Sequence, residues 1–203
     1  MSEQLSFLES EVPQRLSGER DLLDALFFAL VPSVADLPWI IDVIERLRAG
    51  VGLRGNPLSP KCLHVSLFGL GVYLGLPREI VAAARAVGAE VSVSAFDMIL
   101  DRALTFRRHQ TTHPFVLRPS DEIAALAELH EALKLAMLRS SLKKWAASSF
   151  TPHMTLSYDE QIIIEHVVET VRWRVSELVL VHSLRGRGPG RNEHVHLARW
   201  PLQ

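Results

Sequence analysis

The sequence predicts an α+β fold with a mostly antiparallel sheet and about three main helices. Short apolar runs rich in aromatic and β-branched residues recur along the chain, and three other segments space their apolar residues as helices do. The chain has 203 residues, of which 48% are hydrophobic and 22% are charged, and this suits one sizeable core. We expect a flexible N-terminal extension over residues 1–21 and one domain over residues 22–203.

The expected strands are apolar runs that end at turn or loop residues. The first run ends at Pro32, which cannot donate to a sheet ladder. Later runs alternate polar and apolar residues, a period typical of half-buried strands. In chain order, strands are expected over residues 26–31, 63–70, 90–106 with a hairpin near Asp101, 114–117, 153–157, 171–181 and 195–202.

The three expected helices have recognisable ends. The first follows Asp36 as a possible N-cap and closes at Gly50. The second runs over residues 77–87, with a proline at its start and Gly88 after it. The third opens at residues 120–122, whose Ser-Asp-Glu sequence suits a cap and an acidic first turn. Its apolar stripe is formed by Ile123, Leu126, Leu133 and Met137.

Composition excludes several classes of protein. The 22 basic and 23 acidic residues give a net charge of −1, so bulk positive charge cannot hold nucleic acid and any such contact must be local. The single cysteine, Cys62, excludes an internal disulfide and a Cys-rich zinc module. The apolar stretch over residues 25–35 is too short to span a bilayer, and residues 1–20 lack a signal-peptide centre. We expect a cytoplasmic protein without a membrane partner.

Two tetrapeptides share the order His, apolar, hydroxyl, apolar: His64-Val65-Ser66-Leu67 and His153-Met154-Thr155-Leu156. Each lies on an expected strand, where alternate residues face the same way. The histidine and hydroxyl of each copy would then face a cavity while the apolar residues enter the core. Chance gives this form about 0.2 times per chain. The structural alternative is a pair of core-strand histidines bonded to nearby hydroxyls.

Paired imidazoles can perform general acid and general base catalysis together. The unperturbed pKa of histidine, about 6.5, allows one ring to be neutral while the other is protonated near neutral pH. A hydroxyl beside each ring can donate a hydrogen bond to a developing oxyanion. Two such sets suit in-line displacement at a phosphodiester, and they require no metal and no cofactor.

These tetrapeptides resemble those of the two-histidine (2H) phosphoesterases, and more closely the bacterial RNA 2′,3′-cyclic phosphodiesterases, also called 2′-5′ RNA ligase-like or LigT-like proteins. Ser66 replaces the commoner Thr and keeps the hydroxyl. Other segments are similar to the family too: residues 26–30 with Pro32, residues 150–152 before the second motif, residues 177–183 and residues 197–202.

The resemblance implies one domain of two pseudo-symmetric lobes, with outer helices and one motif on each wall of a central groove. It implies hydrolysis of RNA ends bearing a 2′,3′-cyclic phosphate to 2′-phosphomonoesters. His64 and His153 would be catalytic, with the first as acid and the second as base, and Ser66 and Thr155 would hold the phosphate oxygens. Partners would be RNA termini or small cyclic nucleotides, and a monomer is favoured.

Three alternative functions stay open on the sequence. The same groove could perform reversible 2′-5′ RNA ligation or hydrolyse a small cyclic nucleotide. A protein of another class, an RNA-end binding module without turnover, would also use a local phosphate site. Retention of both histidines and both hydroxyls favours an enzyme.

Basic residues outside the tetrapeptides have two interpretations each. Arg107 and Arg108, with His109 and His113, form a possible substrate contact or a solvated turn. The arginines of the Gly-rich segment 185–191 could meet RNA phosphates or belong to a plain hairpin loop, and the segment lacks the Lys-Ser/Thr of a nucleoside-triphosphate loop.

Further residues are weighed for a role in chemistry or binding. His194 and His196 share a strand face but lack a carboxylate spacing that would complete a metal site, so no metal is expected. Cys62 is interpreted as a strand residue rather than a nucleophile. Trp145 and Phe150 could stack on a base, although core packing is favoured.

Overall fold

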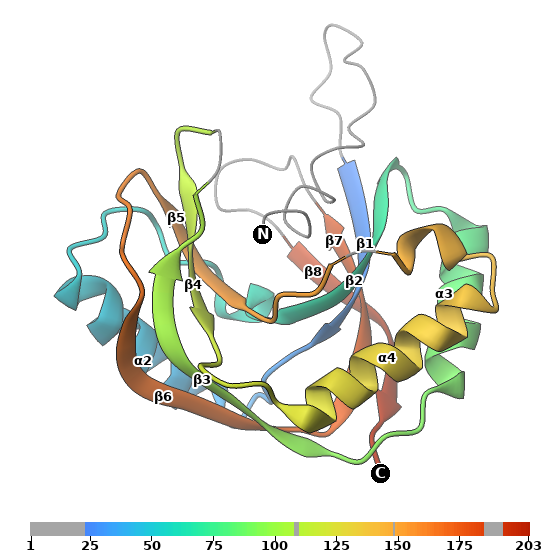
Figure 1. The fold of residues 1–203 in the computed structure, drawn as a ribbon. Helices are drawn as coiled ribbons and strands as arrows, with labels where there is room; N and C mark the ends of the chain where they lie inside the picture. The colour runs from blue at the N-terminus through green and yellow to red at the C-terminus, as the bar shows by residue number, and fades with distance from the viewer. Residues whose placement is uncertain (1–22, 108–109, 148, 185–192) are drawn as a thin grey trace, which may run out of the picture.

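The structure, a computed structural model, describes residues 23–107, 110–147, 149–184 and 193–203. It contains one curved sheet with helices packed against it (Figure 1). The strands are β1 (Leu23–Leu30), β2 (Val65–Leu74), β3 (Phe96–Thr105), β4 (His113–Arg118), β5 (Met154–Asp159), β6 (His166–Val175), β7 (Glu177–Leu184) and β8 (Glu193–Pro201). The helices are α2 (Leu37–Gly50), α3 (Arg78–Glu90) and α4 (Ala124–Leu138), with short 3₁₀ turns η1 (Pro60–Cys62) and η2 (Lys143–Trp145).

The eight strands follow the order β6-β3-β4-β5-β2-β1-β7-β8. Every strand pair in this sheet is antiparallel. Four strands lie on each side of the junction between β5 and β2, where Val65 pairs with Met154. The predicted α+β class, the antiparallel sheet and the three main helices are confirmed. The proposed extension over residues 1–21 lies outside the described residues and stays a prediction.

The main hydrophobic core covers one face of the sheet. Alternate strand residues such as Leu26, Phe28, Val65 and Met154 enter it, and all four are fully buried. The helices close this core from outside: α2 contacts β6, α4 contacts β3, and α3 contacts β7 and β8 (Figure 1). In the described residues, no helix is long and apolar enough to cross a membrane.

The opposite face of the sheet carries a smaller apolar cluster. Phe27 and Ala29 on β1 meet Val179 and Val181 on β7 there, and Val31 packs beside them. These residues alternate with the core residues of the same strands, as strand geometry requires. The second face is therefore separate from the main core.

The expected hairpin near Asp101 is wrong. Strand β3 continues through this residue, and the sheet register with β6 shifts between Leu100 and Arg102. Asp101 accepts hydrogen bonds from the main-chain N–H and the hydroxyl of Ser120. A polar residue in this strand thus marks a bulge and anchors a neighbouring loop rather than forming a turn.

The segment expected as one strand over residues 171–181 is two strands, because regular strand structure is interrupted at Ser176 between β6 and β7. The second helix also runs past its expected end. Gly88 lies inside α3, and a Cβ atom there would stand 2.5 Å from a ring carbon of Trp200. The glycine therefore serves close packing of α3 on β8 rather than termination of the helix.

The two expected helix starts, at Asp36 and at residues 120–122, are also wrong in detail. Asp36 occupies the N-cap position of α2, but its carboxylate accepts a hydrogen bond from the Ser33 hydroxyl and makes no cap bond to the helix. Helix α4 begins after Ile123, so the Ser-Asp-Glu sequence at 120–122 precedes it. In both cases a short polar side chain pairs with another side chain, Asp36 with Ser33 and Ser120 with Asp101, and not with the helix backbone.

Candidate active site

The two His-containing tetrapeptides lie at the starts of the two central strands of the sheet. Strands β2 and β5 are neighbours, and their register pair is Val65 with Met154, the second residue of each tetrapeptide. Both of these apolar residues belong to the main core. The hydroxyl residues that follow, Ser66 and Thr155, therefore face the opposite side of the sheet, and both are half-buried.

The histidines precede these strands by one residue and lie on the same side as the hydroxyls. His64 contacts Phe27 of the second-face cluster, with 4.9 Å between ring centroids. His153 contacts Phe106 at 5.1 Å, in an edge-to-face arrangement. His64 is half-buried, whereas only 8% of His153 is exposed. The strand pairing thus brings the four predicted residues to one region of one face.

Both site histidines orient their rings in the same way. The Nδ1 atom of His64 lies 2.7 Å from the main-chain oxygen of Cys62, and Nδ1 of His153 lies 2.7 Å from that of Thr151. A carbonyl oxygen can only accept, so Nδ1 carries the proton and donates in each ring. The Nε2 atoms are then the ones that change protonation state. A neutral ring can take a proton there and a protonated ring can give one.

The same local contact also occurs at the start of β6. Nδ1 of His166 lies 2.9 Å from the oxygen of Ile164. This ring orientation is therefore a local property of a histidine at the start of a strand. What distinguishes His64 and His153 is their place on adjacent central strands, since β6 is at the edge of the sheet.

Three aromatic neighbours of the histidines were not singled out as such from the sequence. Phe27 touches both His64 and His194, and the rings of those two histidines are 5.1 Å apart. Phe106 packs against His153 on the other side of the site. Phe27 falls on the site face by strand parity, but only the pairing of β7 with β8 brings His194 into contact with His64. Strand parity could therefore have predicted that Phe27 lies near His64, but it could not have predicted the contact between His194 and His64.

A stack of three rings holds the segment that leads to the second tetrapeptide. His130 on α4 lies between Phe68, at 4.3 Å, and Phe150, at 4.1 Å between centroids. Burial, aided by Lys134 and opposed by Glu131, lowers the pKa of His130 to about 4. The ring is therefore neutral near pH 7 and acts as an apolar spacer. Phe150 and the buried Trp145 thus pack in the protein interior, as favoured from the sequence.

Cys62 is buried and lies two residues before His64 in the turn η1, so its interpretation as a strand residue is wrong. Burial, together with the charge of Glu193, raises the pKa of its thiol, although the main-chain N–H of His194 donates to the sulfur and opposes that rise. A thiol with a raised pKa is a poor nucleophile at neutral pH. The environment of Cys62 therefore favours a structural role.

The structure describes some of the other predicted candidates. Arg107 is exposed and directly follows Phe106. Arg108, His109 and the arginine-rich segment 185–191 lie outside the described residues. His113 begins β4 and pairs in register with Asp159. Across the described ranges, no group of three His, Cys, Asp or Glu side chains could hold a metal ion.

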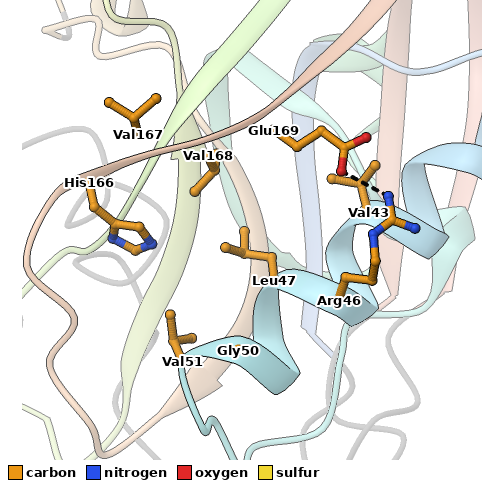
Figure 2. Close-up of a pocket in the computed structure, with 9 residues that line it drawn as sticks. All are labelled: Val43, Arg46, Leu47, Gly50, Val51, His166, Val167, Val168 and Glu169. Carbon is orange, nitrogen blue, oxygen red and sulfur yellow. Dashed lines mark hydrogen bonds and ion pairs between the residues drawn. The ribbon is translucent and has the colours of Figure 1, made fainter.

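One cavity of about 360 Å³ lies away from the tetrapeptides, between α2 and β6 (Figure 2). Its walls are largely apolar, and Arg46 pairs with Glu169 at 2.8 Å along one side. The ion pair joins two exposed side chains, which gives it little energetic weight. This cavity lies on the helix-covered side of the sheet and shares no residue with the candidate active site.

Comparisons with known proteins agree with this architecture. A family model described as the 2′-5′ RNA ligase superfamily matches residues 35–187. The fold is similar to that of E. coli LigT in complex with 3′-AMP, with 24% identity over 89% of this chain and 99% of that one and a TM-score of 0.71. It is also similar to TT0787 of Thermus thermophilus, with 20% identity, coverage of 88% and 97%, and a TM-score of 0.66. No curated protein matches the sequence.

Proposed function

Because the chain belongs to the 2′-5′ RNA ligase superfamily, we propose that it is a metal-independent phosphodiesterase that opens 2′,3′-cyclic phosphate ends of RNA. The superfamily consists of phosphoesterases, so phosphoester chemistry is the coarse activity class of this chain. The finer reaction rests on the two tetrapeptides. Its products would be RNA ends carrying a 2′-phosphomonoester and a 3′-hydroxyl.

The reaction needs one base and one acid on opposite sides of phosphorus. One neutral imidazole takes a proton from water at Nε2 as the water oxygen forms a bond to phosphorus. The bond from phosphorus to the 3′ oxygen breaks, and the second, protonated imidazole gives its Nε2 proton to that oxygen. The shared Nδ1 geometry of His64 and His153 supports this exchange, because it keeps the other nitrogen of each ring for proton transfer. By analogy with the family, His64 is the acid and His153 the base.

The hydroxyls of Ser66 and Thr155 have a separate role in this proposal. They donate to the non-bridging oxygens, whose negative charge grows in the transition state. Each follows its histidine by two residues and lies on the same face of its strand. A phosphate held between the two strands would therefore meet one hydroxyl from each half of the sheet.

The observation that carries the proposal is the register pair of Val65 and Met154, since it places two matching chemical sets on adjacent strands. The decisive experiment is a turnover assay with a dinucleotide that ends in a 2′,3′-cyclic phosphate. We expect a 2′-phosphate product, identified by ³¹P NMR and by comparison with authentic 2′- and 3′-phosphate standards. The double variant His64→Ala/His153→Ala is the control for contaminating nuclease.

The same assay separates the alternatives. Binding of the dinucleotide without turnover would instead identify a non-catalytic RNA-end module. Formation of a 2′-5′ linkage when a 5′-hydroxyl RNA is supplied would identify ligation. Turnover confined to small cyclic nucleotides would replace RNA ends as the substrate class.

A further inference from the structure

A second cavity, of about 210 Å³, adjoins the His64 side of the candidate active site. The turn after β1 supplies an apolar wall that includes Val31 and Val34. The polar wall consists of Lys61, His194, His196 and Arg199. Among the described residues, none that lines this cavity carries a carboxylate group. The cavity is therefore suited to an anion that also carries apolar or neutral atoms.

His194 connects this cavity to the active site. It lines the cavity and also lies 5.1 Å from the ring of His64, centroid to centroid. Leu63, the residue directly before His64, lines the cavity as well. The cavity and the ring of His64 are thus in contact with the same histidine, His194.

His196 contributes its ring to this wall and is held there by Arg199. The Arg199 guanidinium donates to Nδ1 of His196 over 2.6 Å, so the remaining proton of the neutral ring is on Nε2. The Nε2 atom is enclosed and makes no hydrogen bond within the described residues. Burial and the neighbouring charge of Arg199, partly offset by Glu177, lower the pKa of His196, which keeps the ring neutral.

The charges around the cavity favour a phosphate. Lys61 supplies an ammonium group and Arg199 a guanidinium group. Glu177 neutralises part of the Arg199 charge through a 2.6 Å ion pair between half-exposed side chains. Glu193, beside His194 in sequence, is another nearby acid. Lys61 and Arg199 nevertheless place two cationic side chains in a wall without carboxylates, and such side chains bind phosphate oxygens.

We propose that this cavity binds the phosphodiester on the 5′ side of the terminal nucleotide, so that the enzyme prefers an RNA chain end to a cyclic mononucleotide. This inference rests on the proposed function, because the terminal cyclic phosphate must occupy the His64 and His153 site. The apolar wall would contact the ribose of the preceding nucleotide, on the 5′ side of the bound phosphodiester.

The test compares three substrates in kcat/KM: adenosine 2′,3′-cyclic phosphate, its 5′-phosphorylated form, and the dinucleotide ApA with a 2′,3′-cyclic phosphate end. We expect the dinucleotide to exceed the first substrate by about 10-fold, the gain of one charge-assisted contact set. The 5′-phosphorylated mononucleotide distinguishes the two sources of phosphate. A gain there equal to that of the dinucleotide would assign the cavity to a terminal 5′-phosphate and overturn a phosphodiester preference.

Substitutions of the cavity residues test whether they cause the preference for the dinucleotide. Lys61→Gln, His196→Phe and Arg199→Gln should each lower dinucleotide turnover by about 5- to 10-fold while leaving the cyclic mononucleotide within about 2-fold. Arg172→Gln is the matched control, because Arg172 is an exposed arginine on β6, at the opposite edge of the sheet. Equal losses on both substrates would mean that these residues only support the fold, which would overturn the inference.

Measurements of product binding test the proposed cavity even if the protein turns over no substrate. Titration with the dinucleotide ApA 2′-phosphate and with adenosine 2′-phosphate should show tighter binding of the former, and Lys61→Gln should remove that difference. Chain-length-dependent binding without turnover would refute the proposed reaction and retain the cavity. Turnover without any chain-length preference would refute the cavity and retain the reaction.

Discussion

Val65 pairs with Met154 across the junction between the two halves of the sheet, and both side chains are fully buried. The residues on either side of them in sequence, two histidines and two hydroxyls, consequently share the opposite face. A slip of one residue in this pairing would turn one histidine into the core. The register at this single pair is thus the structural condition for a two-histidine site.

Removal of either imidazole should reduce turnover strongly. His64→Ala and His153→Ala are each expected to lower kcat by about 10²-fold or more, because each ring transfers a proton in the transition state. The dissociation constant of the substrate should rise by a smaller factor than the factor by which kcat falls. The matched control is His166→Ala, which removes the same local Nδ1 contact at an edge strand. Near-normal turnover of either site variant, measured on protein with a native circular dichroism spectrum, would eliminate the paired-histidine mechanism.

The pH dependence of kcat/KM should be bell-shaped. One ring must be neutral and the other protonated, so activity should fall both where the two are protonated and where the two are neutral. The two limbs belong to the coupled pair and cannot be divided between His64 and His153 from the profile alone. A profile measured from about pH 5 to about pH 9 that rises to a plateau without a basic limb would contradict an acid role for the second ring.

Activity should persist after exhaustive treatment with EDTA. The proposed proton transfers use side chains only, and the described residues offer no cluster of three metal ligands. The measurement is turnover of the cyclic-phosphate dinucleotide before and after dialysis against chelator. Loss of activity that Zn²⁺ or Mn²⁺ restores would instead support a metal hydrolase.

Cys62 should be dispensable for catalysis. Cys62→Ala is expected to keep kcat within about 3-fold, because a buried thiol with a raised pKa is little ionised at neutral pH. Alkylation by iodoacetamide should be slow in the native protein and fast in urea. Rapid native alkylation that abolishes activity in step with modification would restore a covalent thiol mechanism.

Acid should destabilise the fold through His130. Its pKa is about 4 in the folded protein and 6.5 ordinarily, so the unfolded chain binds a proton first as the pH falls. The free energy of unfolding should be unaffected by this residue above about pH 6.5 and should decrease between about pH 6.5 and 4, by on the order of 3 kcal/mol at most. Urea melts at several pH values measure the effect.

His130→Phe is the informative variant, because a phenyl ring can stack between Phe68 and Phe150 but cannot titrate. Its stability should depend less on pH over that interval. His196, whose pKa is also lowered, contributes a dependence of the same sign that should remain. An unchanged slope in the variant would mean that His130 is not the group responsible.

Strand parity predicted the shared face of His64 with Ser66 and of His153 with Thr155, because alternation is a local property of a strand. It could not predict His194 as a neighbour of His64, since that contact depends on β8 pairing with β7 and β7 with β1. Local signals also failed where a side chain found a distant partner. Asp101 indicated a turn, yet its carboxylate binds Ser120, 19 residues along the chain.

The topology also bears on how the enzyme folds. Leu26 near the start of the described chain pairs with His182 near its end, and Met98 pairs with Trp173. Such pairings close large loops, and their entropic cost is incurred before the contacts that offset it have formed. The helices can form early from local contacts, whereas the two tetrapeptides meet only when Val65 pairs with Met154, 89 positions along the chain. During refolding, regain of activity therefore reports completion of the sheet and should lag behind regain of helical signal.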